Sequence, residues 1–323
     1  MKREEILKEI EYLTLYGRFK ESLQRIEDYK SEHGADDIVF AEEALICGYT
    51  KEYIEGLKCC QIGLQYNIYN SRLYAFMGLM YENLRKSNMA FLLYEHAEFL
   101  SRVDKQNIDP PKELYVKDSD YSHVTVKGLS VIIIANGNEE YTEVCIEAIK
   151  RYLQRENIEI IVVDYNNFKT NDDSVKVVNA EVDYDILSAI TLGSSQANKD
   201  NNLLIIKNNS IVMVNTVLNL ELALYSSNKV GAVCAVSNVA EENQKIEVNC
   251  GSFKDYIAFS EKNNISGTHT YKEITLFETF AFIMKREEVN ELKVDNTANG
   301  KEVLYLSNED SVISCGDSFI YRI

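Results

Sequence analysis

The sequence predicts an all-α helical repeat domain followed by an α/β domain with a mostly parallel sheet. Three observations lead to this prediction: a helical pattern that repeats every 34 residues, a later region where β-branched runs alternate with helical segments, and one pair of adjacent prolines between them. Pro110 and Pro111 cannot continue a helix. The predicted divisions are helical repeats at residues 1–105, a linker at 106–127 and the α/β domain at 128–323.

The composition and charge exclude several classes of protein. The 323 residues are 46% hydrophobic and suffice for two cores, because single cores stop growing near ~250–300 residues. The net charge of −17 argues against binding to nucleic acid and against docking on an anionic membrane. We expect neither a secretory signal nor a membrane span, since no apolar stretch approaches the ~20 residues required. Seven scattered cysteines predict reduced thiols and a cytoplasmic location.

The N-terminal region predicts three helix pairs. The expected pairs are 2–15 with 18–32, 37–48 with 51–66, and 71–84 with 87–101. In the 34-residue register large apolar residues align with small ones, as at Ile10, Ala44 and Gly78. The period and this alternation resemble the tetratricopeptide repeat, whose opening aromatic is present as Phe40 and Tyr74 and whose closing proline is absent.

The resemblance to tetratricopeptide repeats implies a surface that takes a protein or peptide partner. The alternative is that the repeats pack against the second domain or a second copy of the chain, as in a homo- or hetero-oligomer. The sequence leaves both alternatives open.

The remainder of the chain predicts buried parallel strands. Expected strands cover 129–135, 158–164, 203–207 and 230–236, and expected helices lie near 141–153 and 214–227. Apolar runs without alternation are typical of strands buried on both faces, and strand-helix-strand order implies a parallel sheet. Ligands bind at the carboxyl ends of such strands. The segments 135–138, 164–167 and 207–210 are therefore the candidate site.

Five segments of this domain resemble the family-2 glycosyltransferases, which have the Rossmann-like GT-A fold. Residues 129–149 read L-S-V-I-I-I-A-N-G-N-E-E-Y-T-E-V-C-I-E-A-I, similar to the family's V-S-V-I-I-P-T-Y-N strand and E-x-Y-x-x-x-C-I-E-S-I helix. Residues 157–167 read N-I-E-I-I-V-V-D-Y-N-N, where the family has N-x-E-I-I-V-V-D-D-G-S. Residues 203–212 and 230–238 resemble L-L-F-L-N-N-D-T-I-V and V-G-A-V-G-P-V-S. The matches occur in the family's order.

The resemblance implies inverting transfer of a sugar from a nucleotide sugar, commonly a UDP-sugar, to an acceptor. It further implies that the repeats present a protein or peptide acceptor. Carried over by position, the nucleotide-sugar contacts are Ala135, Asn136, Asp164, Asn166, Lys207, Asn208 and Asn209. The family holds Mn²⁺ or Mg²⁺ at the position of Asn209, and its acceptor base corresponds to Glu302 in the segment Gly300-Lys301-Glu302.

The sequence departs from the family pattern at positions that would take part in the transfer reaction. Asn209 replaces the metal-binding Asp, and Tyr165 begins the segment that replaces D-G-S. Asn supplies a neutral carbonyl where divalent cations prefer carboxylates, so no metal ligand set is expected there. Two hypotheses follow. In the first, the chain is an active transferase in which Lys207 or Lys301 replaces part of the metal's charge. In the second, it is an inactive pseudoenzyme that serves as a scaffold or regulatory subunit of an active glycosyltransferase.

Overall fold

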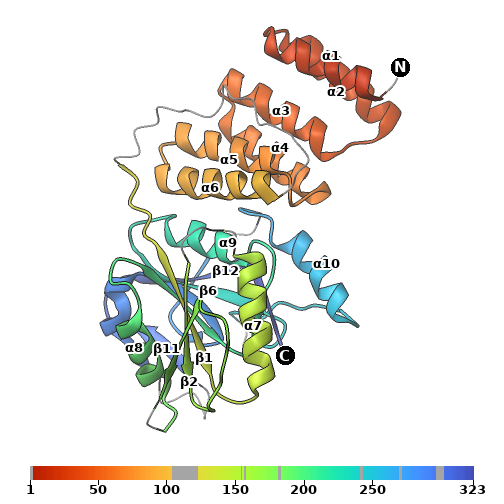
Figure 1. The fold of residues 1–323 in the computed structure, drawn as a ribbon. Coiled ribbons are helices and arrows are strands. Elements are labelled where there is room, and N and C mark those ends of the chain that lie inside the picture. The colour runs from red at the N-terminus through yellow and green to blue at the C-terminus, as the bar shows by residue number, and fades with distance from the viewer. Residues whose placement is uncertain are drawn as a thin grey trace. The chain divides into compact units, whose positions relative to one another are not determined.

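The computed structural model describes residues 3–103, 123–153, 155, 158–180, 183–240, 243–268, 271–295 and 302–323. The chain divides into two compact units, Met1–Thr125 (unit 1) and Val126–Ile323 (unit 2), as Figure 1 illustrates. Pro110, Pro111 and most of the expected linker lie outside the described residues. In the part of the chain that is described, no helix has both the length and the apolar character needed to cross a bilayer.

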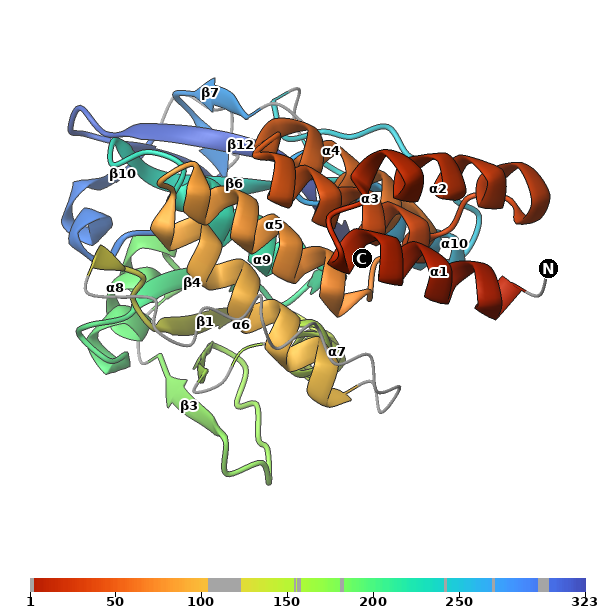
Figure 2. The ribbon, with the colours of Figure 1, turned by 90° about the horizontal axis from the view of Figure 1, so that it is seen from above.

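Unit 1 consists of helices that pack in consecutive pairs. The helices are α1 Arg3–Leu15, α2 Phe19–His33, α3 Asp37–Thr50, α4 Tyr53–Tyr66, α5 Ser71–Asn83 and α6 Ser87–Val103. The most extensive packing is of α5 with α6 and of α3 with α4, whereas α1 packs on α2 to the same extent as α4 packs on α5; the helices are visible in Figure 2. The six expected helices are confirmed, each to within about two residues at either end.

Small residues stand where two helices of unit 1 approach closely. A Cβ atom added to Gly78 of α5 would lie 2.7 Å from the ring of Tyr94 in α6. One added to Gly63 of α4 would lie 2.8 Å from the side chain of Leu73 in α5. The predicted alternation of small and large residues at helix contacts is confirmed, because these backbones approach only where a side chain is missing.

A buried histidine lies in the α5–α6 interface. His96 is 5% exposed and packs edge-to-face on Tyr74, with 4.5 Å between the ring centroids. Its Nε2 atom has no hydrogen-bond partner among the described residues. Burial lowers the pKa of His96 from 6.5 to about 3, because the low-dielectric interior disfavours the imidazolium. The folded unit therefore keeps this side chain neutral.

We predict that unit 1 loses stability as the pH falls from 6.5 toward 3. In this window the unfolded chain binds a proton that folded His96 excludes, so stability falls by up to about 1.4 kcal/mol per pH unit. Hydrogen exchange of the α5 and α6 amides, corrected for the intrinsic rate, measures this slope. His96→Leu should flatten it, whereas the control His33→Gln, at an exposed position, should not. Equal slopes for His96→Leu and the parent chain would contradict the assignment.

Unit 2 is built on a nine-stranded sheet of order β3-β2-β1-β4-β9-β6-β12-β5, with β7 paired to β12. Its strands are β1 Leu129–Ala135, β2 Glu159–Asp164, β3 Val175–Asn179, β4 Asn202–Lys207, β5 Ser210–Val212, β6 Val230–Ser237, β7 Lys272–Ile274, β9 Ala281–Met284 and β12 Ser311–Arg322. The strands β3, β2, β1 and β4 are mutually parallel, as are β6 and β12. The strand β9 runs antiparallel between β4 and β6. The predicted α/β class with a mostly parallel core is confirmed.

Helices cover both faces of this sheet (Figure 1). They are α7 Glu139–Tyr152, α8 Ile186–Gln196, α9 Thr216–Leu224 and α10 Phe253–Asn263. Val131 and Ile133 of β1 pack in the core that contains α7 and α9, whereas Ile132 and Ile134 pack in the core that contains α8. A second, three-stranded sheet of order β10-β11-β8 consists of Leu292–Val294, Val303–Leu306 and Phe277–Glu278. The strands are buried on both faces, as the uninterrupted apolar runs predicted.

Four strands and two helices of unit 2 were predicted, and all six are present. The strand expected at 129–135 has the same bounds as β1. The helix expected at 214–227 corresponds to α9, which is shorter. The strands β9 and β12 were not predicted, because the pairing that makes them strands joins segments far apart in the sequence.

Candidate functional site

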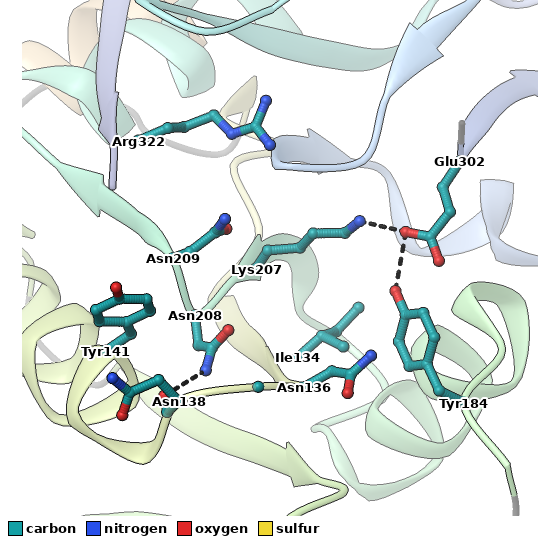
Figure 3. Close-up of a pocket in the computed structure, with 11 residues that line it drawn as sticks. Ile134, Asn136, Asn138, Tyr141, Tyr184, Lys207, Asn208, Asn209, Glu302 and Arg322 are labelled. Carbon is teal, nitrogen blue, oxygen red and sulfur yellow. Dashed lines mark hydrogen bonds and ion pairs between the residues drawn. The ribbon is translucent and has the colours of Figure 1, made fainter. Parts of the chain in front are cut away.

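A cavity of about 320 Å³ lies at the carboxyl ends of β1 and β4 (Figure 3). Five of the residues predicted from the sequence line it: Asn136, Lys207, Asn208, Asn209 and Glu302. Asn138, which belongs to the predicted segment 135–138, also lines the cavity, and lining residues that were not predicted include Tyr141, Tyr184 and Arg322. The two predicted strand ends therefore meet at one cavity, as expected for parallel strands.

The pairing of β1 with β4 determines where the polar residues of the cavity lie. Ile134 stands opposite Lys207 in the register, and the Asn208 backbone N–H donates to the Ile134 carbonyl at 3.1 Å. The Asn208 side-chain amide donates to the Asn138 carbonyl at 3.2 Å and to the Thr142 hydroxyl at 3.0 Å. Since Asn138 is the N-cap of α7, this amide joins the end of β4 to the start of α7.

Lys207 and Glu302 form an ion pair across the cavity (Figure 3). Glu302 also accepts a hydrogen bond from the Tyr184 hydroxyl at 2.9 Å. The side chains of Lys207 and Glu302 are 25% and 31% exposed, so both reach solvent. Burial and the bond to Glu302 raise the pKa of Tyr184, which keeps its hydroxyl protonated as a donor. The carboxylate of Glu302 is thus paired with the ammonium of Lys207 and accepts a hydrogen bond from the phenol of Tyr184.

Arg322 brings a second cation to the cavity from the end of β12. The pairing of β12 with β5 sets Arg322 opposite Ser210, directly after Asn209. One guanidinium nitrogen, Nη1, donates to the Val239 carbonyl and lies 3.4 Å from Oε2 of Glu278. The Nε atom is buried and has no hydrogen-bond partner within the described residues. No local sequence signal marked Arg322 or Tyr184, because both reach the cavity only through tertiary contacts.

Three predicted residues are not among the described residues that line the cavity: Ala135, Asp164 and Asn166. Asp164 is 2% exposed, and its carboxylate accepts from the backbone N–H of Asn166 at 3.0 Å and of Phe168 at 2.8 Å. The Asn166 side chain donates to the Gly137 carbonyl at 2.9 Å. These side chains shape the turn after β2 and tie it to the turn after β1.

Tyr165, which stands at the Asp position of the family's D-G-S segment, is not among the described residues that line the cavity. Its ring contacts that of Tyr184 edge-to-face, with 5.2 Å between the centroids. It therefore supports Tyr184, whose hydroxyl reaches Glu302.

The donor set around the cavity does not fit Mn²⁺ or Mg²⁺. Among the described residues no three His, Cys, Asp or Glu side chains are arranged to hold a metal. The Oδ1 atom of Asn209 is buried without a hydrogen-bond partner in that part of the chain, but its charged neighbours in the cavity include Lys207 and Arg322. Glu302 is the one carboxylate among the described lining residues, and Lys207 holds it. Hard divalent cations prefer carboxylate oxygens, and Mg²⁺ at phosphate sites is usually held by one or two of them. Gly300 and Lys301 lie outside the described residues.

No protein-family model matches the chain, and no curated protein matches it. Similar solved structures include the mannosyltransferase PcManGT from Pyrobaculum calidifontis in complex with GDP-Man and Mn²⁺, with 14% identity, a TM-score of 0.39 and coverage of 61% of this chain and 57% of that chain. GalNAc-T7 with UDP, GalNAc and Mn²⁺ has 12% identity, a TM-score of 0.41 and coverage of 61% and 44%.

A third similar structure is glucosyl-3-phosphoglycerate synthase from Mycobacterium tuberculosis in complex with Mn²⁺, UDP and glucosyl-3-phosphoglycerate. It has 14% identity and a TM-score of 0.32, and the match covers 51% of this chain and 59% of that chain. The chain spans about half the length of the structures that it matches.

We predict that Asp164→Ala lowers the free energy of unfolding of unit 2 by about 1–3 kcal/mol, because two backbone N–H groups lose a charged acceptor at a buried turn. Hydrogen exchange of the β1 and β2 amides measures the loss. The control Asp200→Ala, at an exposed position, should change stability by less than about 0.5 kcal/mol. Equal effects of the two substitutions would refute the structural role of the Asp164 carboxylate.

Proposed function

We propose that unit 2 is a glycosyltransferase-type domain that binds a nucleotide sugar, with a UDP-sugar as the expected donor. The observation that carries the proposal is the position of the cavity. It lies at the carboxyl ends of β1 and β4 and gathers Asn136, Lys207, Asn208 and Asn209 from the two segments that resemble family-2 glycosyltransferases. In open α/β sheets this edge is where ligands bind.

Glu302 is the proposed general base of the transfer. Its carboxylate would take the proton from an acceptor hydroxyl, the hydroxyl oxygen would bond to the anomeric carbon, and the bond from that carbon to the diphosphate would break. Configuration inverts, and the nucleoside diphosphate leaves. The hydrogen bond from Tyr184 supports this role, because it orients the carboxylate within the cavity.

The helical repeats of unit 1 are the proposed site for a protein or peptide acceptor. The support is the tetratricopeptide-like period together with exposed aromatic side chains, among them Tyr16 in the turn after α1, Tyr49 of α3 and Tyr66 of α4. Capture of a specific partner by the full chain, lost after substitution of these three tyrosines by serine, would support the idea. The competing occupant is a second copy of the chain, and sedimentation equilibrium detects it.

A second candidate function is an inactive nucleotide-sugar-binding subunit of an active glycosyltransferase. Two observations favour it. Lys207 holds the carboxylate of Glu302, and an amide stands at Asn209 where the family has its metal-binding Asp. Both features weaken catalysis more than they weaken binding of the donor.

Calorimetric titration with UDP, UDP-glucose and UDP-N-acetylglucosamine, followed by an assay of donor hydrolysis, tests the proposal. For an active transferase we expect donor binding, slow hydrolysis, and loss of about 100-fold or more of that hydrolysis in Glu302→Gln with binding retained. The matched control is Glu309→Gln, an exposed glutamate of the same unit. Binding without hydrolysis would favour the inactive subunit. A chain that binds none of the three nucleotides would contradict both functions.

A further inference from the structure

We propose that the cavity binds the diphosphate of its nucleotide without a divalent cation, through Lys207 and Arg322. This inference rests on the proposed function, because it concerns how the same cavity holds the nucleotide sugar. It assigns to Arg322 a binding role that the sequence did not indicate.

The distribution of charge is the first argument. Residues 106–323 carry 33 acidic and 20 basic side chains, so the domain as a whole repels a diphosphate. Among the described lining residues the order is reversed, since Lys207 and Arg322 stand against the single carboxylate of Glu302. Glu278, which is not among the described lining residues, lies 3.4 Å from Arg322, so the two cations face two carboxylates and the cavity is close to neutral in an otherwise acidic domain.

The geometry of Arg322 is the second argument. The contact of Nη1 with the Val239 carbonyl and the ring of Phe280, whose centroid is 5.1 Å from the guanidinium carbon, hold the side chain in place. Its Nε donor is buried and unpaired with respect to the described residues. An anionic oxygen in the cavity would supply the missing acceptor, and the planar fork of a guanidinium suits phosphate. In the view of Figure 3, Arg322 and Lys207 extend toward the same side of the cavity.

The ion pair of Lys207 is the third argument. An ammonium group has three N–H donors, so Lys207 can donate a hydrogen bond to a phosphate oxygen as its side chain moves away from Glu302. Both side chains are partly exposed, and solvent weakens an ion pair that it reaches, so a more highly charged anion can displace the carboxylate. Binding of the diphosphate would then release Glu302 from its cation.

The amide at Asn209 is consistent with the same arrangement. A carboxylate at this position would repel a diphosphate unless a metal ion bridged the two groups. A neutral amide removes that repulsion. The replacement of Asp by Asn and the presence of two cations therefore both favour binding of the diphosphate without a metal ion.

The test is calorimetric titration of the full chain with UDP, in EDTA and then with Mn²⁺. We expect the same Kd in both conditions and an affinity that falls as salt is added. Lys207→Gln and Arg322→Gln should each weaken UDP by about 10- to 100-fold, the range for hydrogen bonds to charged groups. Arg322→Lys should retain part of the affinity, and the control Lys254→Gln, at an exposed position, should retain all of it.

Glu302→Gln separates the two kinds of site. If Lys207 binds the diphosphate, removal of the competing carboxylate should tighten UDP binding. If Glu302 is instead a metal ligand, the same substitution should abolish binding that depends on Mn²⁺.

The remaining outcomes distinguish this inference from the proposed function. UDP binding that requires Mn²⁺ and ignores Arg322→Gln would overturn the inference and leave the proposed function intact. Binding of inorganic pyrophosphate in EDTA, with no binding of UDP or UDP-sugars, would support the cation pair and overturn the nucleotide-sugar function. Failure of the parent chain to bind any of these anions would overturn both.

Discussion

The parallel pairing of β1 with β4 is the constraint on which the candidate site depends. Its register places Ile134 opposite Lys207, and the backbone bond from Asn208 to Ile134 continues the pairing beyond the end of the strand. Because both strands are buried on both faces, a slip of one residue would turn each side chain into the opposite core layer. The packing of the two cores therefore holds Lys207 at the cavity, and the polar residues at the strand ends follow from that register.

Charges from three distant segments meet at this edge of the sheet. Lys207 is the last residue of β4, Glu302 precedes β11, and Arg322 ends β12, where the pairing with β5 brings it to the cavity. The ion pair between Lys207 and Glu302 balances two of these charges at a partly exposed position, where exchange of partners costs little. The arrangement offers a divalent cation few ligands, because an amide stands at Asn209 and the one carboxylate among the described lining residues, Glu302, is paired with Lys207.

The two units differ in how far apart in the sequence their contacting segments lie. In unit 1 each helix packs mainly on its neighbour in the chain, and close contacts are encoded by small residues such as Gly63 and Gly78. In unit 2 the strand β9 separates β4 from β6, so the central pairing joins residues about 80 positions apart. A local pattern can indicate that a segment is a strand, but it carries no information on which strand lies beside it.

The sequence by itself determined the six helices of unit 1, four core strands and the strand ends that form the cavity. These features follow from periodicity and burial, which each segment expresses alone. Only the tertiary structure decided that Asp164 completes a turn, that Tyr184 donates to Glu302 and that Arg322 reaches the cavity. Each of these outcomes requires hydrogen bonds or strand pairing between segments whose contact is set by the whole core, and no spacing along the chain records it.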